Sequence, residues 1–289
     1  MLTRVAGPLL TVDAPSMLFR AFYALPDSIE GKDGMPVNAL LGTANLILRE
    51  IEQHSPRAVV LCFGPDAAEY RVELFDGYHA ERPEVPERLV PQFADSRAFF
   101  EAFGWVVAWH DSLEADDLLG SYAHREVDAG GTALVMTGDR DMYQCADERV
   151  TVVYVRTGGK GPELVDPAEV RRRYGVDPGQ VPDFIALRGD PSDGIPGAKG
   201  IGEKTAAELL QRHGSLDAAL EGALRETRPT VRKALVDQRE ELLRFREIAT
   251  LQDVDVDLPP DTPTDFAGAA AAARERGMNR LAERLEKAA

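Results

Sequence analysis

The stretch TALVMTGDRD (residues 132–141) joins a short apolar run to a turn that carries two aspartates. An apolar run of this length, bounded by turn residues, is typical of a strand buried on both faces. Three similar runs lie earlier in the chain, at residues 9–12, 58–63 and 105–109. Segments with helical apolar spacing separate them, at about 36–54, 67–77, 86–103 and 114–128. Strands alternating with helices predict an α/β fold with a mostly parallel sheet flanked by helices.

Acidic residues follow three of these four predicted strands. Asp13 comes directly after the first run, and Asp139 and Asp141 follow the fourth. A further group follows the third run after a few residues, in the segment LEADD (113–117): Glu114, Asp116 and Asp117. In open parallel sheets, ligands bind beyond the carboxyl ends of the strands. We therefore expect these six carboxylates to converge at one edge of the sheet.

Six carboxylates cannot share a small volume unless cations neutralise them or protons are taken up. His110 is the only histidine near them, and Cys62 and Cys145 have no spacing that indicates zinc. All-oxygen ligands favour hard ions, so we expect Mg²⁺ or Mn²⁺. Two such ions in a carboxylate cluster are the arrangement that cleaves phosphodiesters, which predicts a two-metal hydrolase.

A structural explanation of LEADD competes with the metal site. Asp111 would cap a helix, with Glu114 completing a capping box, and acids in a first turn suit the helix dipole. In that arrangement all three acids point away from the apolar side of the helix, which is formed by Ala115, Leu118, Leu119 and Tyr122. The acids that follow the first and fourth predicted strands favour a metal site over this purely structural explanation.

The strand–helix alternation ends near residue 155. Two helices are expected next, with Asp166 and Asp177 as their N-caps. The segment GDPSDGIPGAKGIGEKTAAELLQRHGS (189–215) then adds Asp190 and Asp193 and a glycine-rich turn that opens a helix. The segments at about 225–248 and 264–288 are also expected to be helical.

The glycine-rich turn does not fit a nucleotide-binding P-loop, because Glu203 intrudes before Lys204 and Thr205. Backbone N–H groups at a helix N-terminus still bind phosphate. With Lys199 and Lys204 beside them, they would hold a nucleic-acid backbone without reading its sequence. A plain structural turn is the alternative.

Composition sets further bounds. The 289-residue chain is 44% hydrophobic and carries a net charge of −16, which argues against loose polybasic binding to nucleic acid. Its N-terminal apolar run is too short for a secretory signal, and no stretch approaches a membrane span. Two cysteines make no disulfide framework, and each is expected to be a buried small hydrophobe. We expect a monomeric protein of the reduced cytoplasm.

Taken together, the motifs resemble the 5′-nuclease (flap endonuclease) family, which includes the 5′-exonuclease domain of bacterial DNA polymerase I. The resemblance is carried by VDAPSMLFRAFYA (12–24), YRVELFDGYHAER (70–82), LEADDLL (113–119), TGDRDMYQ (137–144) and LRGDPSDGIPGAKGIGEKTAAELL (187–210). It implies a metal-dependent enzyme that cuts DNA near 5′ ends and at single-strand/duplex junctions. It also implies a PIN-like core at residues 1–155 with a helical arch at about 66–95. Residues 156–289 would form a helical DNA-binding region with a helix–three-turn–helix motif, and the chain resembles the stand-alone members.

The resemblance also implies roles for individual residues. The implied metal ligands are Asp13, Glu114, Asp116, Asp117, Asp139, Asp141, Asp190 and Asp193. His79 and Arg82 occupy the catalytic part of the arch. The implied DNA contacts are Arg20, Arg71, Lys199, Gly200, Gly202, Lys204 and Thr205. A potassium ion is implied in the turn at residues 193–202, and the implied partner is DNA with a 5′ flap or a 5′ end at a duplex junction.

The chain departs from the family pattern at two positions. Gly64 stands where the family has an aspartate after the second strand, and His79 stands where the arch has a lysine. With Pro65 at the first position of the next helix, Asp66 is expected to serve that helix. We therefore expect a weakly held second ion, which Gly64→Asp would hold better. The rival functions are a DNA-junction binding protein with weakened chemistry and a PIN-type ribonuclease.

Overall fold

The computed structural model describes residues 7–156 and 161–289. The four predicted strands are present as β1 (Leu9–Asp13), β2 (Ala58–Phe63), β3 (Val106–Trp109) and β4 (Ala133–Thr137). Sequence reasoning missed two more, β5 (Val150–Tyr154) and β6 (Glu163–Val165). The sheet order is β3-β2-β1-β4-β5-β6. All neighbouring pairs are parallel except β5 and β6, so the predicted mostly parallel α/β sheet is confirmed.

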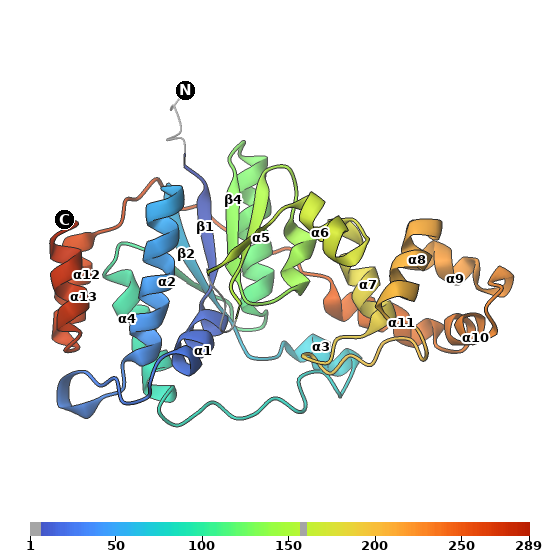
Figure 1. Ribbon diagram of the computed structural model, residues 1–289, viewed down its shortest axis with the longest axis horizontal. Coiled ribbons are helices and arrows are strands. Elements are labelled where there is room, and N and C mark those ends of the chain that lie inside the picture. Colours follow the sequence, from blue (N-terminus) through green and yellow to red (C-terminus); the bar gives the residue numbers. More distant parts are fainter. Residues whose placement is uncertain (1–6, 157–160) are drawn as a thin grey trace.

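Helices connect the strands and form the second half of the chain (Figure 1). In the first half they are α1 (Ala14–Ala24), α2 (Asn38–His54), α3 (Glu69–Leu74), α4 (Val90–Glu101) and α5 (Ala115–Asp128). The second half contains α6 (Pro167–Tyr174), α7 (Val181–Arg188), α8 (Glu203–His213), α9 (Leu216–Glu221), α10 (Pro229–Asp237), α11 (Arg239–Ala249), α12 (Phe266–Glu275) and α13 (Asn279–Glu286). Short 3₁₀ helices lie at Lys32–Gly34, Asp141–Cys145, Pro178–Gln180 and Ala223–Arg225. Among the described residues, no helix is long and apolar enough to cross a membrane.

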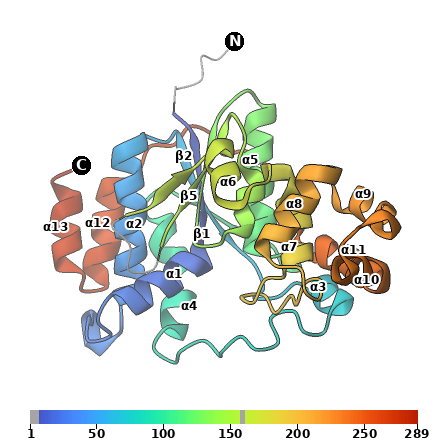
Figure 2. The same cartoon turned by 45° about the vertical axis from the view of Figure 1, so that its right-hand side comes forward.

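The sheet is covered on both faces, because successive strand residues point to opposite sides. Leu9 belongs to a core shared with α5, α7 and α8, whereas Leu10 and Val12 belong to a core shared with α1, α2 and α4. Figure 2 shows these helices on either side of the strands. The alternating burial fixes the register, which brings Asp13 to the carboxyl edge beside Cys62 of β2.

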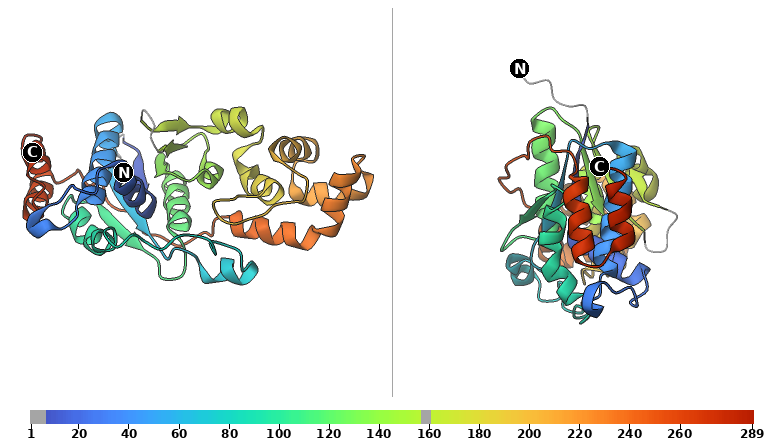
Figure 3. Two further views of the ribbon diagram at one scale, coloured as in Figure 1. Left: turned by 60° about the horizontal axis from the view of Figure 1, so that its bottom comes forward. Right: turned by 90° about the vertical axis from the view of Figure 1, so that its left-hand side faces the viewer.

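The last two helices return to the α/β core. Residues of α12 and α13 share a hydrophobic cluster with α2 and α4. Figure 3 shows them at one end of an elongated molecule, with α8, α9 and α10 at the other end. Residues 266–286 were assigned from sequence to the DNA-binding region. They pack on α2 and α4, away from α8, α9 and α10.

The segment expected to form the helical arch, at about 66–95, is helical only in α3 and in the first residues of α4. After α3 the chain makes turns and then runs without regular structure until α4 begins at Val90. In Figure 1 this teal segment passes below the carboxyl ends of the strands. It is anchored near its start, because the His79 backbone N–H donates to the Asp193 carbonyl at 3.1 Å. The segment therefore joins the α/β core to the turn before α8.

Candidate active site

Asp13 and Asp139 are fixed by the ends of two adjacent strands. Asp13 closes β1 and caps α1 by accepting from the Ser16 N–H at 3.0 Å, and its second oxygen accepts from the Thr137 hydroxyl at 2.8 Å. The same hydroxyl oxygen accepts from the Asp139 N–H at 2.9 Å. Asp139 in turn accepts from the Asp141 N–H at 2.9 Å. Strand ends and short-range hydrogen bonds thus hold three acids at one edge of the sheet.

Asp116 joins this group from the first turn of α5. Burial raises its pKa well above the usual range, and the charges of Asp13 and Asp139 raise it further. Burial also raises the pKa of Asp141, with further contributions from Asp139 and Asp193. Burial likewise raises the pKa of Asp139 to about 7. These carboxylates lie within each other's fields, so the cluster favours bound protons or cations.

Asp190 and Asp193 come to the same edge from the tight turn between α7 and α8. Asp190 pairs its backbone with Ile195 through two 2.8 Å hydrogen bonds. Its carboxylate accepts from Arg188 at 2.8 Å and from the Ser192 N–H and hydroxyl. Gly197 permits this turn, because a Cβ there would lie 2.3 Å from the Gly189 nitrogen. The helical region thus supplies two acids to a cluster built on the sheet.

The donor chemistry of the cluster fits hard divalent cations, since it consists of carboxylate oxygens in a shared, poorly solvated cleft. In the chain as described, no three acidic, histidine or cysteine side chains already stand close enough to enclose an ion. Several are held by other partners, such as Arg188 on Asp190. Ion binding at this cluster therefore requires side-chain rearrangement.

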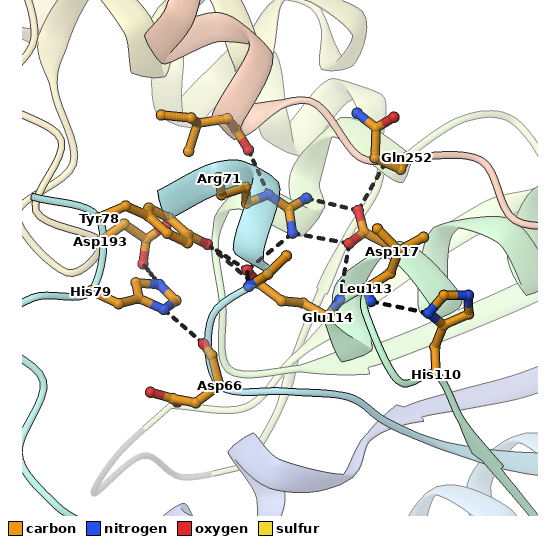
Figure 4. Close-up of polar contacts among 12 residues, drawn as sticks. Asp66, Arg71, Tyr78, His79, His110, Leu113, Glu114, Asp117, Asp193 and Gln252 are labelled. Atoms are coloured by element: carbon orange, nitrogen blue, oxygen red, sulfur yellow. Dashed lines mark hydrogen bonds and ion pairs between the residues drawn. The ribbon is translucent and has the colours of Figure 1, made fainter. Parts of the chain in front are cut away.

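Glu114 and Asp117 form a second group, around Arg71 (Figure 4). Arg71 donates to both oxygens of Asp117, at 2.9 and 2.7 Å, and lies 3.2 Å from a Glu114 oxygen. Glu114 also accepts from the Ala68 N–H at 2.7 Å and the Tyr78 hydroxyl at 2.9 Å. Burial and the Glu114 charge raise the pKa of Tyr78, so it remains a donor. These contacts tie α3 to α5.

This arrangement corrects the predicted start of α5. Glu114 is the N-cap, and it makes a capping box with Asp117 rather than with Asp111. The expectation that all three acids point away from the core was wrong, because Asp117 is fully buried. The cause is Arg71, whose side chain is only 3% exposed and also donates to the Ile248 carbonyl at 3.0 Å. Arg71 and Asp117 therefore lie inside the protein, paired with each other.

His79 and Arg82, from the segment after α3, converge on Asp193. The His79 ring lies 3.2 Å from an Asp193 oxygen through Nε2 and 2.7 Å from the Asp66 carbonyl through Nδ1. Arg82 donates to the same Asp193 oxygen at 3.2 Å and to the Asp66 carboxylate at 3.1 Å. Burial opposes ionisation of Asp193, but the hydrogen bonds and charges of His79 and Arg82 lower its pKa. The arch segment is thereby fastened to one of the predicted ligands.

The backbone around Gly64 leaves no space for a side chain at this position. A Cβ on Gly64 would lie 2.3 Å from the Leu113 carbonyl oxygen and 2.8–2.9 Å from the backbone that follows it. The expected gain from Gly64→Asp is therefore corrected: the chain has closed against the position where the family carries its aspartate. The expectation for Asp66 was also wrong, because α3 begins at Glu69 with Ala68 as its N-cap.

A cleft of about 750 Å³ lies at the carboxyl edge of the sheet, and four acids of the cluster line it: Asp13, Asp116, Asp139 and Asp190. Asp141 and Asp193 are not part of its lining. Its walls include Arg20, which donates to the Ser16 hydroxyl at 3.3 Å and to the Gly138 carbonyl at 2.6 Å. Two more cleft arginines, Arg140 and Arg188, were missed from sequence. Arg140 lies between Asp139 and Asp141 in TGDRD, and Arg188 lies two residues before Asp190 in LRGD. Their closeness in sequence to predicted metal ligands could have identified them as cleft residues.

The predicted phosphate-binding turn lies apart from this cleft. Lys199, Gly200, Gly202 and Lys204 are exposed, Thr205 is partly buried, and none of the five lines the cleft. Gly200 has a φ of 79°, and Gly202 caps α8. The Lys199 N–H donates to the Gln238 side chain at 2.7 Å. The turn thus exposes two lysines, Lys199 and Lys204, beside the N-terminus of α8.

Comparisons with known proteins show the family of the chain. Residues 8–175 match the family model described as "5'-3' exonuclease, N-terminal resolvase-like domain", and residues 176–270 match "5'-3' exonuclease, C-terminal SAM fold". A 5′-3′ exonuclease of Streptomyces coelicolor is 38% identical over 299 residues, covering 96% of this chain and 98% of that protein. One from Mycobacterium tuberculosis is 36% identical, covering 98% of each. The chain also matches 29% of the length of the DNA polymerase I of that organism, at 34% identity over 90% of its own length.

Solved structures share the fold at lower identity. A structure of T5 5′-exonuclease with bound zinc has a TM-score of 0.69 at 17% identity, covering 97% of this chain and 98% of that one. The catalytic core of Rad2 in complex with DNA substrate has a TM-score of 0.64 at 15% identity, covering 96% and 92%. The family-model matches span most of the chain, and full-length relatives exceed 30% identity. The protein belongs to the 5′-3′ exonuclease family.

Proposed function

We propose that this protein hydrolyses DNA phosphodiester bonds near 5′ ends and at single-strand/duplex junctions, as a 5′-3′ exonuclease and flap endonuclease. The observation that carries the proposal is the carboxylate cluster in the cleft at the carboxyl edge of the sheet. Burial and the charges of neighbouring acids raise the pKa values of Asp116 and Asp141, and the cleft is also lined by arginines. Among relatives of similar length, two are 5′-3′ exonucleases. A solved neighbour is described as a flap endonuclease complex with DNA and metal ions.

The residues that would hold divalent ions are Asp13, Asp116, Asp139, Asp141, Asp190 and Asp193. Mg²⁺ or Mn²⁺ suits their oxygen donors, and such ions supply an activated water and stabilise the leaving oxygen. We assign Glu114 a place at the rim, where it lines the cleft but is also held by Arg71 and Tyr78. Asp117 and Arg71 act as positioning residues, because each neutralises the other inside the protein.

The cationic side chains have separate tasks in this proposal. Arg20, Arg140 and Arg188 line the cleft and would hold the phosphate beside the carboxylates. Lys199 and Lys204 would hold the duplex backbone at the turn before α8, which fixes register without reading sequence. A potassium ion would bind in that turn, at residues 193–202. His79 and Arg82 would keep the arch segment against Asp193 while the strand enters.

The test is incubation with a labelled 5′-flap DNA and either Mg²⁺ or Mn²⁺, with products sized on a gel. Cleavage near the junction supports the proposal. Binding without cleavage at any metal concentration would favour a DNA-junction binding protein, and cleavage confined to RNA would favour a PIN-type ribonuclease. Asp116→Asn is the matched control, because it keeps the side-chain shape and removes one charge.

A further inference from the structure

Trp109 exposes a large aromatic ring at the carboxyl end of the edge strand β3. It is 57% exposed, whereas Trp105, the other tryptophan of the chain, is 3% exposed. Phe63 lies directly across from it in the register of β2 and β3. The two rings are stacked, with centroids 6.2 Å apart and planes at 24°, and Phe63 is only 5% exposed. Trp109 thus rests on a buried ring and leaves much of its own surface open.

The orientation of the Trp109 ring is held by a hydrogen bond. Its indole Nε1–H donates to the Asp111 carboxylate at 2.9 Å. The residues that follow are ordered by His110, whose Nδ1 accepts from the backbone N–H of Ser112 at 3.2 Å and of Leu113 at 3.0 Å. A ring positioned in this way loses little conformational freedom when a ligand packs on it.

The open side of Trp109 belongs to the cleft that contains the carboxylates. Glu114 and Asp116 line the same cleft a few residues further along the chain. The lining of the same cleft also includes Phe63, on which Trp109 stacks, and the apolar side chains of Phe19, Val90 and Phe93. The cleft therefore offers both ionic and aromatic groups. A nucleotide also has both, a charged phosphate and a flat base.

We propose that Trp109 is a stacking platform for an unpaired base of the DNA strand whose phosphodiester lies at the carboxylates. The proposal rests on the proposed function and adds a subsite to it. Stacking of a base on an aromatic side chain contributes about 1–3 kcal/mol and is tolerant of sequence. A base inside a duplex has both faces covered by its neighbours, so the subsite selects nucleotides that have left the stack.

Tryptophan fluorescence provides a direct test of this subsite. A Trp105→Phe protein reports on Trp109 alone, and a chelator prevents cleavage while DNA binds. Duplex DNA with a 5′ single-stranded tail should quench the emission, and a blunt duplex should quench it much less. An abasic site moved one nucleotide at a time through the tail should abolish the quenching at one position. At that position the affinity should fall about fivefold to a hundredfold, as expected for one lost stack.

Substitutions separate stacking from simple packing. Trp109→Ala should weaken the binding of tailed DNA about fivefold to a hundredfold, as the abasic site does. Trp109→Phe should keep most of the wild-type affinity, and Trp109→Leu should not. Leu164→Ala is the control, since Leu164 is 50% exposed on β6, the opposite edge strand. Equal affinities for Trp109→Ala and wild type, with no position-dependent quenching, would overturn the platform. Flap cleavage that remains intact in that case would leave the proposed function standing, so the two failures are distinct.

Discussion

Asp116 and Asp117 are neighbours in LEADD, yet the structure gives them opposite surroundings. Asp117 is fully buried and accepts hydrogen bonds from the two terminal nitrogens of the Arg71 guanidinium. Asp116 faces the cleft, where burial and the charges of Asp13 and Asp139 raise its pKa. A buried carboxylate is stable when a cation of the protein accompanies it, and otherwise it needs an external cation or a proton. The acids of LEADD therefore have two different roles: Asp117 stabilises the fold through Arg71, and Asp116 is available to bind a cation in the cleft.

The largest effect is expected when the ion pair between Arg71 and Asp117 is removed. Arg71→Met should lower the free energy of unfolding by about 3–5 kcal/mol, because it leaves Asp117 and Glu114 without their cation. Urea denaturation measures the change. Arg97→Met is the control, since Arg97 forms an exposed pair with Glu101. A loss no larger than that of the control would show that the Arg71 pair contributes little to stability.

The next largest effect is expected on cleavage, when a carboxylate in the cleft is neutralised. Asp116→Asn and Asp139→Asn should each lower flap cleavage by at least about a hundredfold, the scale of losing one catalytic electrostatic group. Binding of the same DNA should persist, because its phosphates are held by cations elsewhere. Single-turnover cleavage and a gel-shift titration measure the two quantities. Near-normal cleavage by both variants would contradict the assignment of the metal site.

A smaller effect is expected at Gly64. Gly64→Ala should destabilise the protein by about 1–3 kcal/mol, the usual cost of overpacking, because its Cβ meets the backbone of Leu113 and Glu114. Gly64→Asp should cost at least as much and should not lower the metal concentration required for cleavage. Gly179→Ala is the control, since a Cβ there meets nothing within 4 Å. A stable Gly64→Asp protein with a lower metal requirement would restore the sequence-based expectation.

In the metal-free protein, the stabilities of wild type and Asp116→Asn should depend differently on pH. The raised pKa of Asp116 means that the folded chain holds this proton more tightly than the unfolded chain. Stability is therefore lost as pH rises above the ordinary carboxyl range, and Asn at this position escapes that loss. With a chelator present, the free energy of unfolding of Asp116→Asn should match that of wild type near pH 4 and exceed it near pH 8. An advantage that does not grow with pH would contradict the electrostatic account.

The smallest effect concerns the turn before α8. Lys199→Ala and Lys204→Ala should each weaken duplex binding alike for unrelated sequences and lower the salt slope by about one unit. Lys233→Ala is the control, because Lys233 is already paired with Asp237. A changed sequence preference would contradict a phosphate contact.

Sequence predicted the four parallel strands and the acids behind them, because strand ends in a parallel sheet share an edge. It did not predict which acids would be paired. Arg71 lies 46 residues before Asp117, and periodicity carries no information on such a distant partner. Gly64 could only be interpreted as a missing ligand, since the approach of Leu113 depends on how two loops pack. The alanine-rich pattern of α12 predicted a helix but not that it packs beside α2 and α4.

The most direct test of the account is calorimetric titration of Mn²⁺ into Asp116→Asn and Asp117→Asn, each verified as folded at the temperature used. The account predicts that Asp116→Asn stays at least as stable as wild type but loses affinity for at least one ion by about 10–100-fold. Asp117→Asn should be clearly less stable in urea and should bind Mn²⁺ within a few fold of wild type. Weakened Mn²⁺ binding by Asp117→Asn, together with unchanged binding by Asp116→Asn, would contradict the division between the paired and the cleft-facing acid.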